Sequence, residues 1–381
     1  MMNQRRNYSA WHKHSFQPGL TSKHTFGAMT SRMMNNVSTY RELREFQEEK
    51  DSSPSLFPRP TLTSSSVIPA VEPARGMQHS FSILQQDILR TLAYFDVFAY
   101  PLSGEQIYTY LPRNSVSPPQ VEETLNSLVM SGLVQSANGF YFFPDRPASV
   151  ITERLQNEIR AARMMKRVRR IAFFLRQVPF VRAVFITGSL SKNVAGPSSD
   201  ADFMIVTAPN RLWITKMFLT AFRRVFLLNS IRYFCLNLFV TEKGFPFLDQ
   251  NVFNAIEVAT TQVLWNRDAY RKFQSANSWI EQFLPNRKRT IHSEESGAHS
   301  PLQRIGEMLL SVLPLVSLDL LIMRSARQYW RKKNLHLDEE RFNSLFHCTP
   351  DISSVWYDDH QTRILNSYRR RLVQFGIERP A

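Results

Sequence analysis

The segment Val184–Thr207, VFITGSLSKNVAGPSSDADFMIVT, constrains the fold more than any other part of the chain. It begins with an apolar run typical of a buried strand, Val184–Thr187, and ends with a second such run, Ala201–Thr207. Gly188 and Ser189 stand where the first run ends, and a short helix and a polar loop fill the space between the runs. This order predicts a strand–turn–helix–loop–strand unit at the centre of a domain that contains both helices and strands.

Two aspartates, Asp200 and Asp202, lie where the second strand begins. Because side chains alternate along a strand, both carboxylates point to the same face, roughly 6–7 Å apart. They repel each other unless a cation lies between them, and such oxygen ligands, with room for water and phosphates, suit Mg²⁺. The N–H groups of a turn that opens a helix can hold a phosphate, to which Gly188 permits close approach and the Ser189 hydroxyl can donate. The segment predicts a site for a magnesium-bound phosphate, and the alternative is a surface loop with two solvated aspartates.

Gly-Ser, ten intervening residues and then Asp-x-Asp entering an apolar strand resemble the signature of the DNA polymerase beta-type nucleotidyltransferase superfamily. The signature covers about 20 residues, and the domain that it implies extends to about Asn286. The resemblance implies that Asp200 and Asp202 hold one or two Mg²⁺ ions, and that Gly188 and Ser189 cradle the phosphates of a nucleoside triphosphate (NTP). An unidentified acceptor would attack its α-phosphate. Lys192, in the helix after the turn, either assists in phosphate binding or faces solvent.

In this superfamily a third carboxylate lies on the strand after the next helix, where it accepts the proton of the attacking hydroxyl and helps to bind metal. Here Ser230–Thr241 predicts that strand, and the matching position is Asn237. An amide can coordinate a cation but cannot take a proton at neutral pH. Glu242, Asp249 or Glu257 could substitute, and the spacing does not select among them. The chain is therefore expected to be a nucleotidyltransferase or a catalytically weak or inactive nucleotide-binding regulator.

The length and composition of the chain limit the number of domains and the class of protein. The chain has 381 residues, 43% of them hydrophobic, which allows two or three domains with real cores. Its two cysteines, Cys235 and Cys348, lie far apart without a metal-ligand pattern, which favours free thiols and a cytoplasmic location. No apolar run reaches the roughly 18 residues of a membrane span, so we expect no transmembrane segment. Residues 1–80 predict a disordered or poorly ordered extension, with a short helix at Thr39–Lys50.

Residues 81–150 predict a separate small module. Apolar residues at helical spacing predict three helices, the second of which starts with the capping pair Ser103 and Gln106. Asn138 and Gly139 then stand between two short β-prone runs, which is a strong hairpin signal. Three helices followed by a hairpin resemble a winged helix-turn-helix.

The charge of this module argues against DNA binding. The range from Ser82 to Val150 holds three basic residues and six acidic ones. The helix that would enter a groove carries Glu122 and Glu123 and neither Lys nor Arg. Duplex binding depends mostly on neutralising phosphates, so a role in packing or protein contact is favoured.

The positive charge of the chain, formally +15 overall, is concentrated in the next helix, Ile151–Gln177. This helix holds eight basic residues, from Arg154 to Arg176, against two acids, Glu153 and Glu158. The helix either presents an ordinary solvated face or forms a basic wall that concentrates a polyanion near the nucleotide site. A second alternative for the whole protein is therefore nucleic-acid binding through basic helices.

The fold expected is an α/β (α+β) nucleotidyltransferase core with a mixed sheet, a winged-helix-like module before it and a helical C-terminal region. The predicted divisions are 1–80, 81–150, a basic connecting helix at 151–180, the core at 181–286, and 287–381. Further helices are expected at Pro209–Leu228, Asn251–Leu264, Tyr270–Leu284, Ile305–Lys333 with a break at Pro314, and Tyr357–Val373. In the first of these, Arg211 and Lys216 are either phosphate contacts or plain surface charges.

Overall fold

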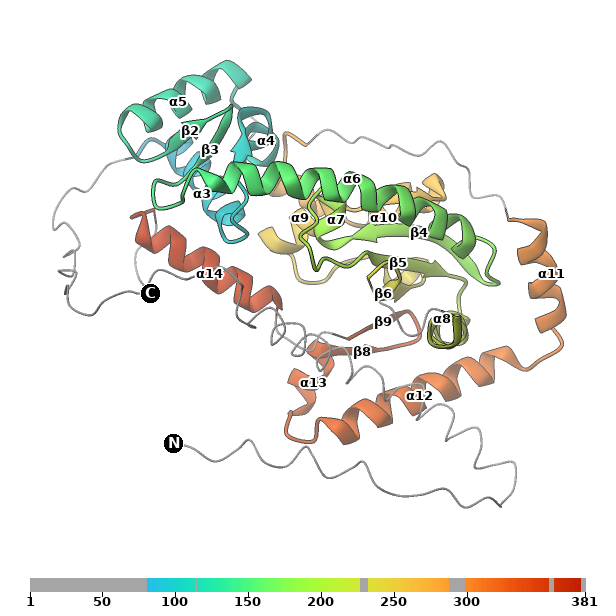
Figure 1. Ribbon diagram of the computed structural model, residues 1–381. Helices are drawn as coiled ribbons and strands as arrows, with labels where there is room; N and C mark the ends of the chain where they lie inside the picture. The colour runs from blue at the N-terminus through green and yellow to red at the C-terminus, as the bar shows by residue number, and fades with distance from the viewer. Residues whose placement is uncertain (1–80, 114, 227–231, 288–298, 356–359, 378–381) are drawn as a thin grey trace, which may run out of the picture. The chain divides into compact units, whose positions relative to one another are not determined.

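A computed structural model describes residues 81–113, 115–226, 232–287, 299–355 and 360–377 (Figure 1). All the described residues belong to one compact unit, Ser55–Ala381. The expected extension at 1–80, with its short helix, lies outside the described residues. The described part is an α+β structure with mixed sheets, which confirms the expected fold class at that level.

A six-stranded mixed sheet organises the chain. Its strand order is β7-β4-β5-β6-β9-β8, in which β5 and β6 are parallel and the other neighbours are antiparallel. The strands are β4 Val181–Thr187, β5 Asp202–Thr207, β6 Cys235–Val240, β7 Gln262–Trp265, β8 Phe346–Cys348 and β9 Ile352–Val355. The two apolar runs of the constraining segment are thus adjacent antiparallel strands near the middle of the sheet.

Both faces of the central strands are covered. Phe185 and Met204 point into the core that also holds residues of α9 (Val252–Thr260) and α10 (Arg267–Ala276). Phe203, which alternates with Met204 along β5, is also fully buried. Its ring contacts Phe234, which contacts Phe222 of α8 (Leu212–Phe226), and Phe222 stacks on Phe174 of α6 (Ser149–Leu175). The apolar runs are continuous because each strand has helices on both sides.

Two local expectations for the sheet were wrong. The predicted helix at Asn251–Leu264 ends at Thr260, and the following residues form the edge strand β7. Thr260 and Thr261 are β-branched, and Thr261 already has an extended backbone with ψ of 129°. The C-terminal region is not only helical, because β8 and β9 form a hairpin that extends the sheet beside β6.

The predicted module begins with α3 (Ile83–Asp96), β1 (Leu102–Ser103), α4 (Gly104–Tyr110) and α5 (Pro118–Met130). A hairpin of β2 (Gln135–Ala137) and β3 (Phe140–Phe142) follows, and the three strands pair antiparallel in the order β1-β3-β2. The capping box of Ser103 and Gln106 is present, and Asn138 and Gly139 have φ of 52° and 77°, as a tight hairpin turn requires.

The remaining described helices are α7 Gly188–Ser191, η2 Glu242–Gly244, η3 Ser278–Gln282, α11 Pro301–Leu310, α12 Leu315–Lys333, α13 Glu339–Leu345 and α14 His360–Gln374. The predicted break at Pro314 is confirmed, since it separates α11 from α12. Among the described helices, none is by itself long and apolar enough to cross a membrane. The pair α11 and α12 meets that test only when taken together, and it is bent by 88°.

Candidate functional site

The Gly-Ser turn and the aspartates meet at one end of the strand pair β4 and β5. Thr187, the last residue of β4, pairs with Asp202, the first residue of β5, and its Oγ1 donates to the Asp202 carbonyl at 3.1 Å. Gly188 has φ of +68°, and a Cβ at that position would lie 3.3 Å from Asp202 Cγ and well inside contact distance of its Oδ2. The structure therefore brings together the two halves of the motif, with the carboxylate lying against the backbone of the turn.

Ser189 lies in a single helical turn, α7, which covers only Gly188–Ser191. Its carbonyl accepts from the N–H groups of Lys192 and Val194 at 3.0 and 3.1 Å, and its side chain is half-buried. Gln262 of β7 anchors the turn by donating to the Ser191 carbonyl at 2.6 Å. A phosphate here would be held by local N–H groups and the Ser189 hydroxyl, because so short a helix adds little dipole.

The environment of Asp202 disfavours its charge. Burial, the largest effect, and the negative charges of Asp200 and Glu257 together raise the pKa of Asp202 to about 7. A hydrogen bond from Cys235 and the positive charge of Lys192 act in the opposite direction. A cation placed between the two aspartates would act against both effects, since a nearby positive charge favours the ionised carboxylate.

Asp200 lies just before β5 and is half-buried. The N–H of Ala201, between the two aspartates, donates to the Arg232 carbonyl at 3.0 Å. This bond joins the start of β5 to the segment that precedes β6. Burial and both aspartate charges raise the pKa of Cys235 well above its ordinary value, so it remains a neutral thiol.

The strand register shows which residue of β6 lies beside Asp202. Asp202 pairs with Cys235 and Phe203 with Leu236, but Met204 pairs with Leu238. Asn237 therefore occupies a bulge between rungs and has no opposite residue in β5. The predicted third position lies two residues beyond Cys235, the direct neighbour of Asp202, which sequence reasoning did not single out.

Of the three carboxylates that could substitute, Glu257 is the one whose charge raises the pKa of Asp202. Glu242 lies past the far end of β6 and pairs with Lys272 at 2.8 Å. Glu257 comes from α9, and its Oε1 accepts from Lys192 Nζ at 2.7 Å. Lys192 also donates to the Gly188 carbonyl at 3.0 Å, so it connects the turn to Glu257 rather than only facing solvent.

Arg211 and Lys216 do not belong to this site. Both follow the opposite end of β5, where α8 begins. Lys216 Nζ donates to Ser353 Oγ of β9 at 2.7 Å, and Arg211 donates to the Asn210 carbonyl. Lys216 is therefore neither a phosphate contact of this site nor a plain surface charge, because its ammonium group is bound to Ser353 of the sheet.

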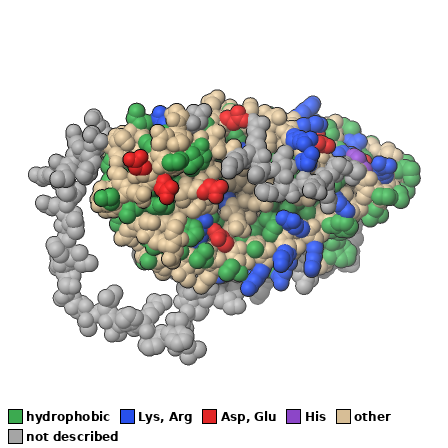
Figure 2. Space-filling view, turned by 90° about the horizontal axis from the view of Figure 1, so that it is seen from above, with side chains coloured by type: hydrophobic (Ala, Val, Ile, Leu, Met, Phe, Trp, Pro, Cys, Tyr) green, Lys and Arg blue, Asp and Glu red, His purple; other side chains and the backbone are tan. Residues whose placement is uncertain are grey.

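A basic cavity lies beside the aspartates, with a volume of about 180 Å³. Its walls include Arg160, Arg163 and Arg167 from one side of α6, Arg232 before β6, and Ser199, which directly precedes Asp200. Lys and Arg side chains lie mainly on the right of Figure 2, and Asp and Glu side chains mainly on the left. A cavity with four guanidinium groups suits a ligand that carries several phosphates.

The arginines of α6 do not all contribute to this surface. Arg154 is only 5% exposed and turns inward, where it donates to Glu158 at 2.9 Å, to Gln106 and to the Pro101 carbonyl. Arg154 is therefore not available for the expected polyanion contact across Arg154–Arg176.

In the part of the chain that the structure describes, no group of three or more His, Cys, Asp or Glu side chains is arranged to hold a metal. The available donor set is the Asp200 and Asp202 pair. It fits Mg²⁺, which is commonly held by one or two carboxylates together with substrate phosphates and water.

Comparison with protein-family models, curated proteins and solved structures gives no match.

Proposed function

We propose that this protein is a Mg²⁺-dependent nucleotidyltransferase that transfers a nucleoside monophosphate from an NTP to an acceptor hydroxyl. The close approach of the Asp202 carboxylate to Gly188 carries the proposal. It supports a site in which the turn would bind phosphate and the adjacent carboxylate would bind metal. This is the arrangement that the resemblance to the DNA polymerase beta-type superfamily implies. The mixed sheet with helices on both faces supports the corresponding core.

Each residue has a defined task in this proposal. Asp200 and Asp202 would hold the metal, which when bound would neutralise charge on the triphosphate. The turn at Gly188 and Ser189 would bind the β- and γ-phosphates through N–H and hydroxyl groups. Lys192 orients Glu257 at 2.7 Å, and Glu257 is the carboxylate best placed to take the proton of the attacking hydroxyl, a role that Asn237 cannot fill.

Calorimetry with MgATP and MgGTP on the full chain tests the nucleotide site. Asp200→Asn with Asp202→Asn should weaken binding at least about tenfold, because two carboxylate ligands are lost. Asp268→Asn is the matched control, since its side chain is 66% exposed in α10, and it should bind like the wild type. Wild-type affinity in the double variant would contradict the site.

A nucleotide-binding regulator without transferase activity is the second candidate. It is favoured by Cys235, a neutral thiol, as the direct neighbour of Asp202, and by the engagement of Glu257 with Lys192. Pyrophosphate release from labelled NTP across a panel of acceptors separates the two. Binding without release for every acceptor would favour the regulator.

Polyanion binding at the basic cavity is a further candidate, which rests on its four arginines. Arg163→Gln with Arg167→Gln should weaken binding of a short single-stranded RNA about tenfold at low salt and flatten its salt dependence. Arg169→Gln with Arg170→Gln removes the same charge from exposed positions of the same helix outside the cavity. Anisotropy titrations at several salt concentrations make the comparison, and equal losses in both pairs would contradict a specific cavity.

For the module at 81–150 we propose a winged-helix-like fold in a packing or protein-contact role. The order of three helices and a hairpin supports it, with β1 as a third strand. Glu122 and Glu123 on α5 argue against duplex binding. A cytoplasmic location fits the two cysteines, both of which are buried free thiols.

A further inference from the structure

The helix α11 has the reverse of the usual amphipathic arrangement. Its large apolar side chains are exposed, together with those of the bend and the first turn of α12. Exposed fractions run from 46% to 83% for Leu302, Ile305, Met308, Leu309, Val312 and Val316. The buried residue of α11 is a polar one, Gln303. A surface helix normally buries its apolar stripe and exposes its polar side.

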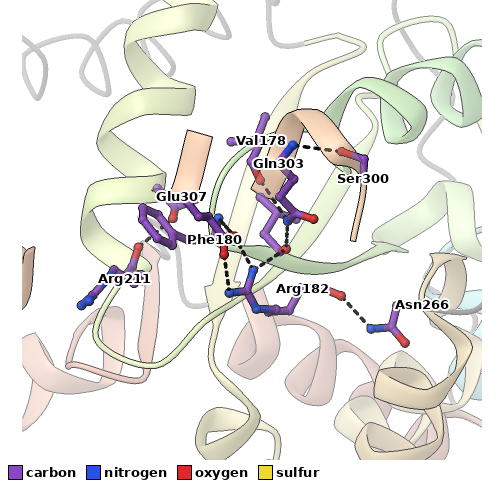
Figure 3. A network of polar contacts seen from close by, with 10 residues as sticks. Val178, Phe180, Arg182, Arg211, Asn266, Ser300, Gln303 and Glu307 are labelled. Carbon is purple, nitrogen blue, oxygen red and sulfur yellow. Dashed lines mark hydrogen bonds and ion pairs between the residues drawn. The ribbon is translucent and has the colours of Figure 1, made fainter. Parts of the chain in front are cut away.

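Polar contacts hold α11 in this orientation (Figure 3). Gln303 Nε2 donates to the carbonyls of Val178 and Val181. Glu307 accepts from Arg182 Nη1 and from the N–H of Phe180, both at 2.7 Å. These hydrogen bonds hold the polar side of α11 against the residues at the start of β4. The apolar side of the helix therefore faces outward.

The acids of this segment point inward. Between residues 299 and 337 the sequence holds two acidic residues, Glu307 and Asp319. Glu307 is bound to Arg182, and Asp319 is 1% exposed and accepts from the N–H of Ile214 at 2.9 Å. The exposed charges are cationic, and they include Arg304, Arg324 and Lys332. The outer surface of α11 and α12 thus combines apolar side chains with positive charge.

We propose that this surface, which we call the α11–α12 face, docks onto an anionic lipid bilayer. An apolar side bordered by Arg and Lys is the pattern of helices that lie in a membrane interface. Lys and Arg bind anionic headgroups while the apolar side chains enter the acyl boundary. Figure 2 shows apolar side chains gathered at its right-hand end, where α11 lies in Figure 1. This inference is independent of the nucleotide site.

Co-sedimentation of the full chain with phosphatidylcholine–phosphatidylglycerol vesicles tests the proposal. The wild type should bind, and Leu309→Asp with Val312→Asp should weaken partitioning at least about tenfold, because the variant places carboxylates against the acyl boundary and anionic headgroups. Leu248→Asp with Met130→Asp is the matched control. These side chains are 90% and 89% exposed outside the α11–α12 face, and their replacement should leave binding unchanged.

Several outcomes would overturn the proposal. Absence of wild-type binding would do so, as would equal losses in the two double variants. Binding that disappears at high salt but ignores Leu309→Asp with Val312→Asp would show adsorption by charge alone. If that variant instead converted a dimer to a monomer in light scattering without changing vesicle binding, a second copy would be the occupant. Vesicle binding that appears only after removal of residues 1–80 would show that this segment covers the face.

Discussion

At the scale of single residues, the candidate site depends on the backbone conformation of Gly188. Its φ of +68° is accessible to glycine at little cost, and the missing Cβ leaves room for the Asp202 carboxylate. The same approach of carboxylate to backbone would place a bound phosphate and a bound metal next to each other. Under the proposed function, this one small residue would therefore serve both the turn and the metal site.

Gly188→Ala should destabilise the fold by about 2–4 kcal/mol, because it adds left-handed strain to a clash with Asp202. Gly376→Ala is the control, since Gly376 has φ of +66° but nothing within 4 Å of an added Cβ. It should cost about 1 kcal/mol from backbone strain alone. Chemical denaturation measures both values, and equal costs would show that Asp202 does not press against the turn.

The sequence pointed to Gly188, Ser189, Asp200 and Asp202 because all four lie within one local strand–turn–strand unit. It did not point to Cys235, and it named Glu257 only as one of three candidate carboxylates without selecting it. Cys235 lies beside Asp202 because of a bulge in the register of β5 and β6, and local patterns do not record such a shift. Glu257 reaches the site because α9 packs near the turn, which is a tertiary property.

At the scale of elements, Lys216 of α8 connects that helix to the edge of the sheet. Its Nζ donates to Ser353 of β9 at 2.7 Å, and burial lowers the pKa of Lys216 to about 8. Nearby Arg223 also lowers this pKa, whereas Cys348 raises it. The folded chain thus binds this proton less tightly than the unfolded chain, and holding the charge at neutral pH costs stability.

Lys216→Met should raise the free energy of unfolding at pH 7 by about 1–2 kcal/mol, because it removes a buried charge at the cost of one hydrogen bond. The wild type should gain stability between about pH 8 and pH 10.5, where only the folded chain has released the proton. The advantage of the variant should therefore shrink over that window. Urea denaturation at pH 7 and pH 10 measures it, with exposed Lys166→Met as the control. A constant difference would contradict the buried charge.

Elements whose conformation is determined by residues close in sequence were predicted well. The α6 helix and the β2–β3 hairpin follow their periodicity and turn residues, and their predicted positions are confirmed. The strands β7, β8 and β9 were missed because each has only three or four residues. Their identity as strands comes from pairing: β7 pairs with β4, β9 with β6, and β8 with β9. No local period of useful length marks them.

At the scale of the whole described unit, the module at 81–150 is not packed by its own residues alone. The C-terminal helix α14 packs on α3, and Phe375 stacks on Phe143 with ring centroids 3.9 Å apart. One apolar cluster runs from α3 to the strands of the main sheet. The predicted domain boundaries at 150 and 287 therefore follow the order of elements along the chain. In space, the contacts of α14 join the C-terminal region to the module at 81–150.

Arg371 of α14 provides the polar part of this junction. Its Nε lies 2.6 Å from Asp96 Oδ2, and its two terminal nitrogens donate to the carboxylate of Asp145, which lies 226 residues earlier. The bond from Arg371 lowers the pKa of Asp145, as expected for a carboxylate that accepts a charged donor. Asp96 is 6% exposed, so loss of a cationic partner there is costly.

Arg371→Ala should lower the free energy of unfolding by about 1–3 kcal/mol, because Asp96 would keep Arg146 as a partner but lose half of its neutralising charge. Arg370→Ala is the matched control on the same helix. Arg370 is exposed and bonds to Ser367, and its loss should stay within about 0.5 kcal/mol. Hydrogen exchange should also quicken in α14 and α3 together in the Arg371 variant. Faster exchange confined to α14 would mean that the module is stable without its C-terminal helix and that the two ends fold independently.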